Sequence, residues 1–199
     1  MFVRPAISDE FSYCHLFGLY LGDGCISEKN PQLAFHFDAA YPKIVETAEE
    51  SMRILAPEKH VHRRSRKGRN VVILDCGWVR WPDYFPQAVP GRKHERPIVL
   101  EPWQQEIVDR EPQAFLRGLI ESDGCRVVNR FKTTLPSGRV AEYAYPRYFF
   151  SNMSADIRGL FCASCERIGV HWTQSNHRNI SVSHRASVAV LDAFIGPKG

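Results

Sequence analysis

Two blocks of the sequence share one pattern, and each ends in an aspartate followed by a glycine. They read LFGLYLGDG over residues 16–24 and LRGLIESDG over residues 116–124. If the two aspartates, Asp23 and Asp123, lay side by side, their charges would repel each other unless a cation intervened. Oxygen ligands suit Mg²⁺ or Mn²⁺, and carboxylate-held metals hydrolyse phosphodiester bonds. The blocks therefore predict a metal-dependent hydrolytic site.

Each block also has the features of a helix that packs closely against a partner. Gly18 and Gly22 are four residues apart, as are Gly118 and Ser122, so one face of each helix is nearly bare. Parallel packing of the two bare faces would bring the acids at both helix ends to one place. An Asp-Gly pair often does no more than end a helix, but two matched copies favour a functional site.

The repeat extends beyond the blocks and predicts two fused copies of one domain. Asn70 corresponds to Asn179, and Asp83 corresponds to Asp192. The period is too long for a solenoid, so we expect an α+β fold with the order αββαββα in each half and pseudo-twofold symmetry between the halves. The predicted boundaries are a first half over residues 1–93, a linker over 94–111 and a second half over 112–199.

Hydrophobic periodicity and turn residues place the elements within each half. Ser8 is expected to cap the first helix and Gly24 to end it, while Ser154 is expected to start a helix that ends at Gly169. The remaining elements of the first half are strands within 25–37, a helix over 42–56, strands within 60–76 and an aromatic segment over 78–85. Those of the second half are a helix from 112, a long hairpin over 125–152, strands within 170–184 and a helix over 186–195.

Composition narrows the class of protein. The 199 residues carry a net charge of +4 and are 44% hydrophobic, so the chain can bury a sizeable core. The sequence has neither an apolar run of membrane-spanning length nor a secretory signal pattern. We therefore expect a cytoplasmic protein, or an organellar one if it is encoded there, that is not secreted. The six cysteines suit a reducing compartment, and we expect them in the core.

Basic residues are concentrated in part of the chain. Residues 59–69 include six Lys or Arg and no acid, whereas acids gather at 46–50 and 101–111. Such asymmetry favours a polyanionic partner.

The two blocks resemble the LAGLIDADG motif of homing endonucleases, and the duplicated order resembles the two-motif members of that family over nearly the whole chain. The resemblance implies a monomer with an internal pseudo-dimer, whose two four-stranded sheets form a saddle in the major groove of double-stranded DNA. It implies that Asp23 and Asp123 are the catalytic acids and hold Mg²⁺ or Mn²⁺. Gly22 and Ser122 would offer backbone carbonyls to the metal.

Further residues match the family by position. Lys93 and Lys198 match the basic residue that family enzymes place near the active centre, where it would stabilise charge in the transition state. The sixth motif position, often acidic in the family, is Leu21 in the first block and Glu121 in the second. About half of the residues of any strand can face DNA. The predicted DNA-binding residues are Arg63, Arg64, Arg66, Lys67, Arg69, Arg126, Arg130, Lys132, Arg139, Gln174, Asn176 and Arg178.

The interpretation favoured by these features is a site-specific double-strand DNA endonuclease. Two alternatives on the same fold stay open. One is a non-cleaving DNA-binding regulator, which loss of the acids would mark, and both acids are present. The other is an RNA maturase with intron RNA as its partner.

Overall fold

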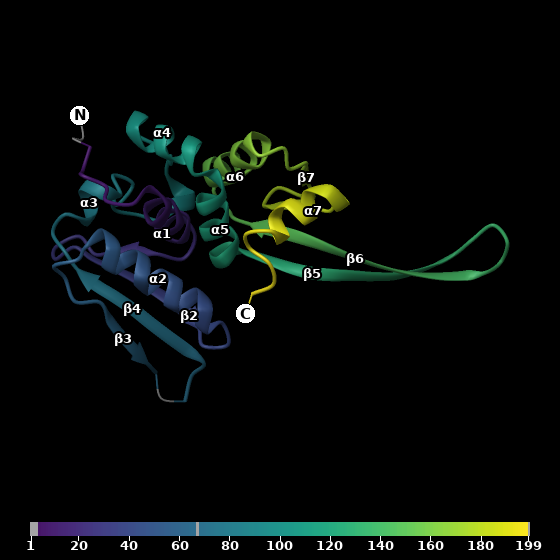
Figure 1. Ribbon diagram of the computed structural model, residues 1–199, viewed down its shortest axis with the longest axis horizontal. Helices are drawn as coiled ribbons and strands as arrows, with labels where there is room; N and C mark the ends of the chain where they lie inside the picture. Colours follow the sequence, from purple (N-terminus) through teal and green to yellow (C-terminus); the bar gives the residue numbers. More distant parts are fainter. Residues whose placement is uncertain (1–3, 67, 199) are drawn as a thin grey trace.

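Two antiparallel sheets flank a pair of central helices in the computed structural model, which describes residues 4–66 and 68–198 (Figure 1). The central helices are α1 (Glu10–Gly22) and α5 (Pro112–Asp123). Within the described residues, the two four-stranded sheets have the orders β1-β2-β4-β3 and β5-β6-β8-β7. Each half follows the order αββαββα, so the predicted α+β fold class is confirmed.

The first half forms its sheet from strands with alternating burial. Leu33 and Phe35 of β2 are fully buried and pair with Cys76 and Leu74 of β4, which are also fully buried. The apolar side of this sheet therefore packs on the helices. The elements are β1 (Cys25–Ile26), β2 (Gln32–Asp38), α2 (Pro42–Leu55), β3 (His62–Ser65), β4 (Val71–Gly77) and α3 (Trp81–Tyr84).

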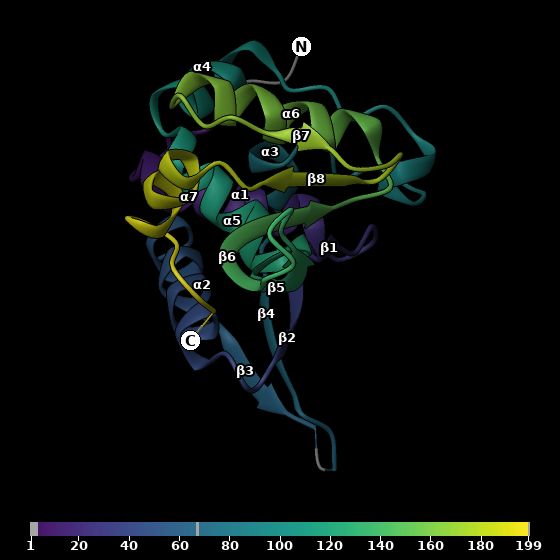
Figure 2. The same ribbon diagram turned by 90° about the vertical axis from the view of Figure 1, so that its right-hand side faces the viewer.

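The second half differs by a long hairpin that leaves the body of the molecule. Strand β6 pairs with β8 only over Tyr148–Ser151, so the rest of the β5–β6 hairpin is two-stranded and projects into solvent (Figures 1 and 2). We call residues 126–147 the arm. The elements are β5 (Gly124–Thr134), β6 (Val140–Ser151), α6 (Ala155–Arg167), β7 (Thr173–Gln174), β8 (Asn179–Val182) and α7 (Arg185–Asp192).

The segment expected to link the halves contains a short 3-10 helix, η1 (Lys93–Glu95), and the helix α4 (Pro102–Arg110). Ile107 is fully buried, and the buried Gln104 donates to the Tyr13 hydroxyl at 2.8 Å. Gln104 and the cap residue Glu101 also form a capping box. The segment over 94–111 is therefore part of the core as well as a connection.

Two expected helix boundaries have different outcomes. Asp9, not Ser8, caps α1, because the Ser12 backbone N–H donates to Asp9 Oδ2 at 2.7 Å. The Ser8 hydroxyl instead donates to the Ile54 carbonyl at 3.1 Å. Ser154 caps α6 as predicted, and Gly169 follows that helix with a φ of 71°, a conformation that favours glycine.

Cysteine burial corrects one expectation. Within the described residues all six cysteines are free thiols, and four of them are buried, but Cys25 and Cys125 are exposed. Each of these two follows a motif glycine and lies on the side of its sheet that faces away from the helices.

No helix in the described part of the chain has the length and apolar composition needed to cross a membrane.

Candidate active site at the ends of the central helices

Helices α1 and α5 touch through their backbones. A Cβ atom at Gly18 would lie 2.5 Å from the Phe115 carbonyl oxygen, and one at Gly118 would overlap the His15 carbonyl oxygen. One turn further on, a Cβ at Gly22 would overlap the Ser122 hydroxyl. Because equivalent residues meet each other, the helices are parallel and related by the expected pseudo-twofold axis. Their C-terminal ends therefore lie together.

Neighbouring atoms leave room only for glycine at the position after each acid, which is Gly24 or Gly124. A Cβ at Gly24 would lie 2.7 Å from both Phe35 Cε1 and the Tyr20 Cα, and one at Gly124 would lie 2.7 Å from the Ile120 Cα. In each half, the backbone passes from helix to strand at this glycine, where the neighbouring atoms leave no room for a side chain. This tight turn holds Asp23 and Asp123 at the two helix ends.

The environment of the two acids is unequal. Asp23 is exposed and Asp123 is partly buried. Burial and the neighbouring charge of Asp23 raise the pKa of Asp123 to about 6. Asp123 Oδ2 would lie 3.1 Å from a Cβ at Gly22, so this carboxylate reaches the end of the opposite helix. Within the described residues, Asp23 thus lies close enough for its charge to raise the pKa of Asp123.

Two cavities open beside the helix ends. One, of about 120 Å³, is lined by residues that include Asp23, Ser122 and Lys198. The other, of about 470 Å³, is lined by residues that include Gly22, Lys93 and Asp123. Each cavity combines the acid of one motif with the residue that precedes the acid in the other motif. Each also contains one of the two predicted lysines.

Both lysines bind the carbonyl ends of the central helices. Lys93 Nζ donates to the carbonyls of Gly24 at 2.6 Å and Gly22 at 3.3 Å, and also to that of Tyr20. Lys198 Nζ donates to the Glu121 carbonyl at 2.8 Å. Burial lowers the pKa of Lys93 to about 8, although Asp123 and Asp23 oppose that shift. The lysines therefore place positive charge where two helix dipoles end.

Asn152 is a site residue that the sequence did not reveal. Its Nδ2 donates to Asp123 Oδ2 at 2.6 Å, and its Oδ1 accepts from the Ser154 backbone N–H at 2.8 Å. The second contact fixes the amide so that its nitrogen points at the acid. An asparagine two residues before a helix cap is an ordinary turn signal, so the sequence alone gives it no catalytic meaning.

Glu121 forms a buried polar network between the two motif helices. Its Oε2 lies 2.7 Å from Nε2 of the fully buried His15, and its Oε1 accepts from Arg117 Nε at 2.7 Å. His15 Nδ1 lies 3.2 Å from the Ser51 hydroxyl on α2. Burial raises the pKa of Glu121, but the contacts with His15 and Arg117 outweigh burial and leave the pKa below its usual value.

The predicted DNA-binding residues of the first half lie on different sides of the sheet. Arg64 points away from the helices and pairs with Asp75, which also accepts from Gln32. Arg63 points towards α2 and lies 3.5 Å from Glu49. Arg66 and Arg69 are exposed in the turn between β3 and β4, and Lys67 lies outside the described residues.

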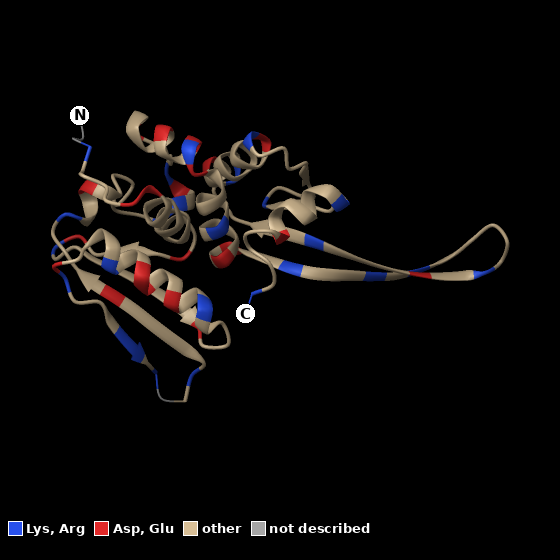
Figure 3. Cartoon of the chain, viewed as in Figure 1, with Lys and Arg blue, Asp and Glu red and all other residues tan. Residues whose placement is uncertain are grey.

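In the arm, some of the predicted basic residues pair with acids and others are exposed. Arg126 donates to Asp192 at 2.7 and 2.8 Å and is thereby held against α7. Lys132 pairs with Glu142 across the hairpin. Arg130 and Arg139 are exposed, and Figure 3 shows Lys and Arg spaced along the arm.

The third predicted group lies at the end of β7 and in the turn that follows it. Gln174, Asn176 and Arg178 are all exposed. Asn176 Oδ1 accepts the backbone N–H groups of Arg178 and Asn179, each at 3.0 Å, so this side chain shapes the turn. The predicted DNA-binding residues therefore belong to three segments, namely the β3–β4 hairpin, the arm and the β7–β8 hairpin, and their contacts with DNA stay a prediction.

Comparison with solved structures identifies the fold. The chain is similar to the LAGLIDADG meganuclease I-AabMI bound to uncleaved DNA, with a TM-score of 0.56, 12% identity and coverage of 92% of this chain and 82% of that one. It is similar to mesophilic variants of the homing endonuclease I-DmoI, with a TM-score of 0.60, 15% identity and coverage of 93% and 89%. It is also similar to DUF199/WhiA from Thermotoga maritima, with a TM-score of 0.58, 17% identity and coverage of 97% and 57%.

These likenesses define the class of fold. No protein-family model matches the sequence, and neither does any curated protein. The chain has the duplicated fold of the LAGLIDADG homing endonucleases, which confirms the resemblance of the two blocks at the level of structure.

Proposed function

We propose that this chain is a site-specific endonuclease that uses a divalent metal to cut both strands of DNA. The observation that carries the proposal is the meeting of Asp23 and Asp123 at the paired ends of α1 and α5. Two proteins of this fold, I-AabMI and I-DmoI, were solved with DNA bound. The mildly basic net charge of +4 is compatible with such a partner.

The donor atoms at the helix ends fit Mg²⁺ or Mn²⁺. The described residues include no group of three or more His, Cys, Asp or Glu arranged around one point, so water and phosphate oxygens would complete the ligands. Asp23, Asp123 and the carbonyls of Gly22 and Ser122 would hold the metal. Burial raises the pKa of Asp123, and the neighbouring charge of Asp23 adds to the shift. A bound cation would oppose both effects. I-DmoI with DNA was solved with Ca and with Mn.

When bound, the metal would stabilise charge on the scissile phosphate and lower the pKa of a water molecule. The chain's own residues supply the rest. Asn152 orients the Asp123 carboxylate through its 2.6 Å hydrogen bond. Lys93, whose pKa of about 8 leaves it mostly protonated at pH 7, would stabilise charge that develops on phosphate oxygens. Lys198 would do the same in the smaller cavity, which gives one lysine to each DNA strand.

The test begins with a DNA target selected from a random duplex library by binding to the full chain. Asp23→Asn and Asp123→Asn should each lower double-strand cutting with Mg²⁺ by on the order of a thousandfold or more, while Kd for the target changes only a few-fold. Asp83→Asn is a matched control because Asp83 is exposed and lies on α3, outside both cavities. Cutting that persists in both helix-end variants would reject the assignment.

A non-cleaving DNA-binding protein is the second candidate. Two observations favour it: the same fold occurs in DUF199/WhiA, whose name states no nuclease activity, and both lysines are engaged by helix carbonyls. Specific binding to the selected duplex with no cutting in Mg²⁺ or Mn²⁺ would establish this candidate in place of the nuclease.

A further inference from the structure

The ammonium group of Lys93 is held by several groups at the C-terminal end of α1. Its Nζ donates to the carbonyls of Gly24 at 2.6 Å and Gly22 at 3.3 Å, and also to that of Tyr20. It also lies 4.5 Å from the centroid of the Tyr20 ring, where the ring face attracts a cation. Carbonyls at a helix C-terminus lack partners within the helix and carry the negative end of its dipole. The end of α1 is therefore a cation-binding position, and the Lys93 side chain fills it.

The Gly22 carbonyl has two uses that conflict. In the proposed function it is a metal ligand near Asp123, yet it already accepts a hydrogen bond from Lys93. All three residues line the same cavity of about 470 Å³. Two cations on one oxygen repel each other strongly where water is partly excluded. One of them must therefore leave the Gly22 carbonyl before the other can bind it.

We propose that Lys93 is a built-in stand-in for the metal, so that a divalent ion binds at the Gly22 carbonyl only by displacing the Lys93 ammonium. The displaced ammonium then becomes free to bind a phosphate oxygen in the same cavity. Lys93 thus becomes available to the substrate only after the metal has arrived. This inference rests on the proposed function, because that function makes the Gly22 carbonyl a metal ligand.

The backbone that carries Lys93 is anchored, so displacement needs only rotation of the side chain. Arg96 Nη2 donates to the Gln87 carbonyl at 2.6 Å. Gln87 Nε2 in turn donates to the Val99 carbonyl and to Oε1 of the buried Gln104, each at 2.7 Å. These contacts tie the loop that carries Lys93 to the core. The cavity beside it is large compared with the roughly 30 Å³ of one water molecule, so the four-carbon stem has space to swing.

Lys198 provides a matched comparison at the other helix end. Its Nζ donates to the Glu121 carbonyl at 2.8 Å, one residue before the Ser122 carbonyl that is the proposed metal ligand. Burial raises the pKa of Asp123, and the charges of Lys93 and Lys198 both oppose that shift. Removal of either lysine therefore takes one positive charge away from the same acid. Only removal of Lys93 also frees a proposed metal ligand.

The first measurement is the Kd of Mn²⁺ for the full chain without DNA, from the electron paramagnetic resonance signal of the free ion. Lys93→Met and Lys198→Met each keep an unbranched side chain and lose its charge, so both should gain affinity from the lost repulsion. If Lys93 fills its position for about nine-tenths of the time, the apparent Kd of the native chain is about tenfold weaker than that of the open site. Lys93→Met should therefore bind Mn²⁺ about tenfold more tightly than Lys198→Met does.

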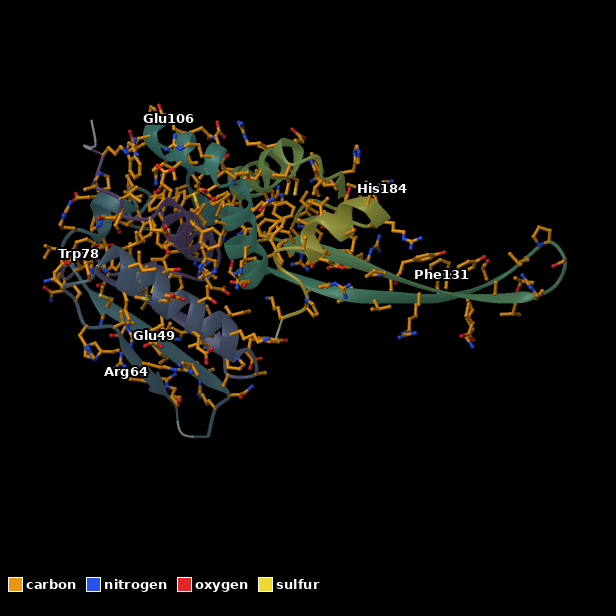
Figure 4. The ribbon with its side chains drawn as sticks, in the orientation of Figure 1. Glu49, Arg64, Trp78, Glu106, Phe131 and His184 are labelled. Carbon is orange, nitrogen blue, oxygen red and sulfur yellow. The ribbon has the colours of Figure 1, made fainter. Side chains whose placement is uncertain are left out.

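The second measurement follows the displacement in the native chain, with no substitution. Lysines are acetylated at fixed pH with and without saturating Mn²⁺, and each modified residue is quantified by mass spectrometry. Labelling of Lys93 should rise severalfold with Mn²⁺, while that of Lys198 changes much less. Lys132 is the internal reference, because it lies on the arm next to Phe131, which Figure 4 shows clear of the body.

Equal gains in affinity in the two variants overturn the inference, as does Lys93 labelling that Mn²⁺ leaves unchanged. A lack of Mn²⁺ binding by the native chain and both variants also overturns it. If the Tm shows that either variant is unfolded, the labelling of the native chain decides. The proposed function is judged separately, by whether the native chain cuts the selected duplex with Mg²⁺ or Mn²⁺.

Discussion

Gly18 and Gly118 lie opposite each other across the α1–α5 interface, and a Cβ built on either one would be 3.0 Å from the Cα of the other. Backbone contact, rather than interlocking side chains, therefore sets the separation of the two helices. The separation of Asp23 and Asp123 follows from it, because each acid ends one of these helices.

Gly118→Ala should be strongly destabilising, because its Cβ would overlap the His15 carbonyl, which belongs to a helix backbone that cannot move aside cheaply. We expect the free energy of unfolding to fall by roughly 3 kcal/mol, at the upper end of the range for overpacked cores. Urea denaturation provides the measurement. Gly159→Ala is the control: it lies exposed in α6 with no atom near its Cβ position, so it should stabilise by about 0.5–1 kcal/mol. Equal stability of Gly118→Ala and the native chain would contradict the packing.

Asp123→Asn should stabilise the protein at neutral pH while it removes cutting. The folded-state pKa of Asp123 is about 6, above the ordinary value of 3.8, so ionisation is less favourable in the folded state than in the unfolded state. The resulting loss of stability is absent below pH 4 and complete above pH 6. We expect a gain of roughly 1–2 kcal/mol at pH 7.5 that shrinks towards zero near pH 4. Thermal unfolding at both pH values measures it, with Asp83→Asn as the variant that should show no gain.

Cutting should depend on pH in a bell shape. It should rise through about pH 6 as Asp123 ionises and fall above about pH 8 as Lys93 loses its proton. Protons and metal compete for the carboxylate, so a higher Mg²⁺ concentration should move the acid limb to lower pH. Single-turnover rates over pH 5–10 give the profile. Lys93→Arg keeps its charge at high pH, and an alkaline limb unchanged in that variant would remove Lys93 from the explanation.

Glu121→Leu should cost stability because it leaves His15 and Arg117 without their shared partner in a buried place. Removal of one member of a buried charged pair costs about 3 kcal/mol or more. The double variant His15→Phe/Glu121→Leu should recover part of that loss, since the residues at the equivalent positions of the repeat, Phe115 and Leu21, are apolar and fully buried. Chemical denaturation of the single and double variants provides the measurement, and additive losses would argue against a direct pair.

The sequence predicts those features that are encoded locally or by repetition. The spacing of Gly18 and Gly22, repeated at Gly118 and Ser122, is sufficient to predict the helix pair and the place of the acids. The order of strands and helices follows from periodicity in the same way. The helix within the expected linker was not foreseen, although Pro102 is an ordinary first helical residue.

Features that depend on contacts between distant segments were not predictable. Asn152 contacts Asp123 only because β6 returns to the end of α5. His15 contacts Glu121 only because the two halves pack against each other. The direction of Arg126, which points at Asp192, depends on the register of β5 against β6. Register and docking are set by the whole core, so no single segment encodes them.

The contact between His15 and Glu121 favours the pairing of a first half with a second half over the pairing of two like halves. If two first halves associated, His15 would face Leu21, and its ring would lose the carboxylate. If two second halves associated, Glu121 would face Phe115 in a buried place. Each like-with-like pairing isolates a polar group from its mate, whereas the pairing of unlike halves satisfies both. The pseudo-twofold symmetry is thus broken at this buried contact in a way that favours the intramolecular pairing.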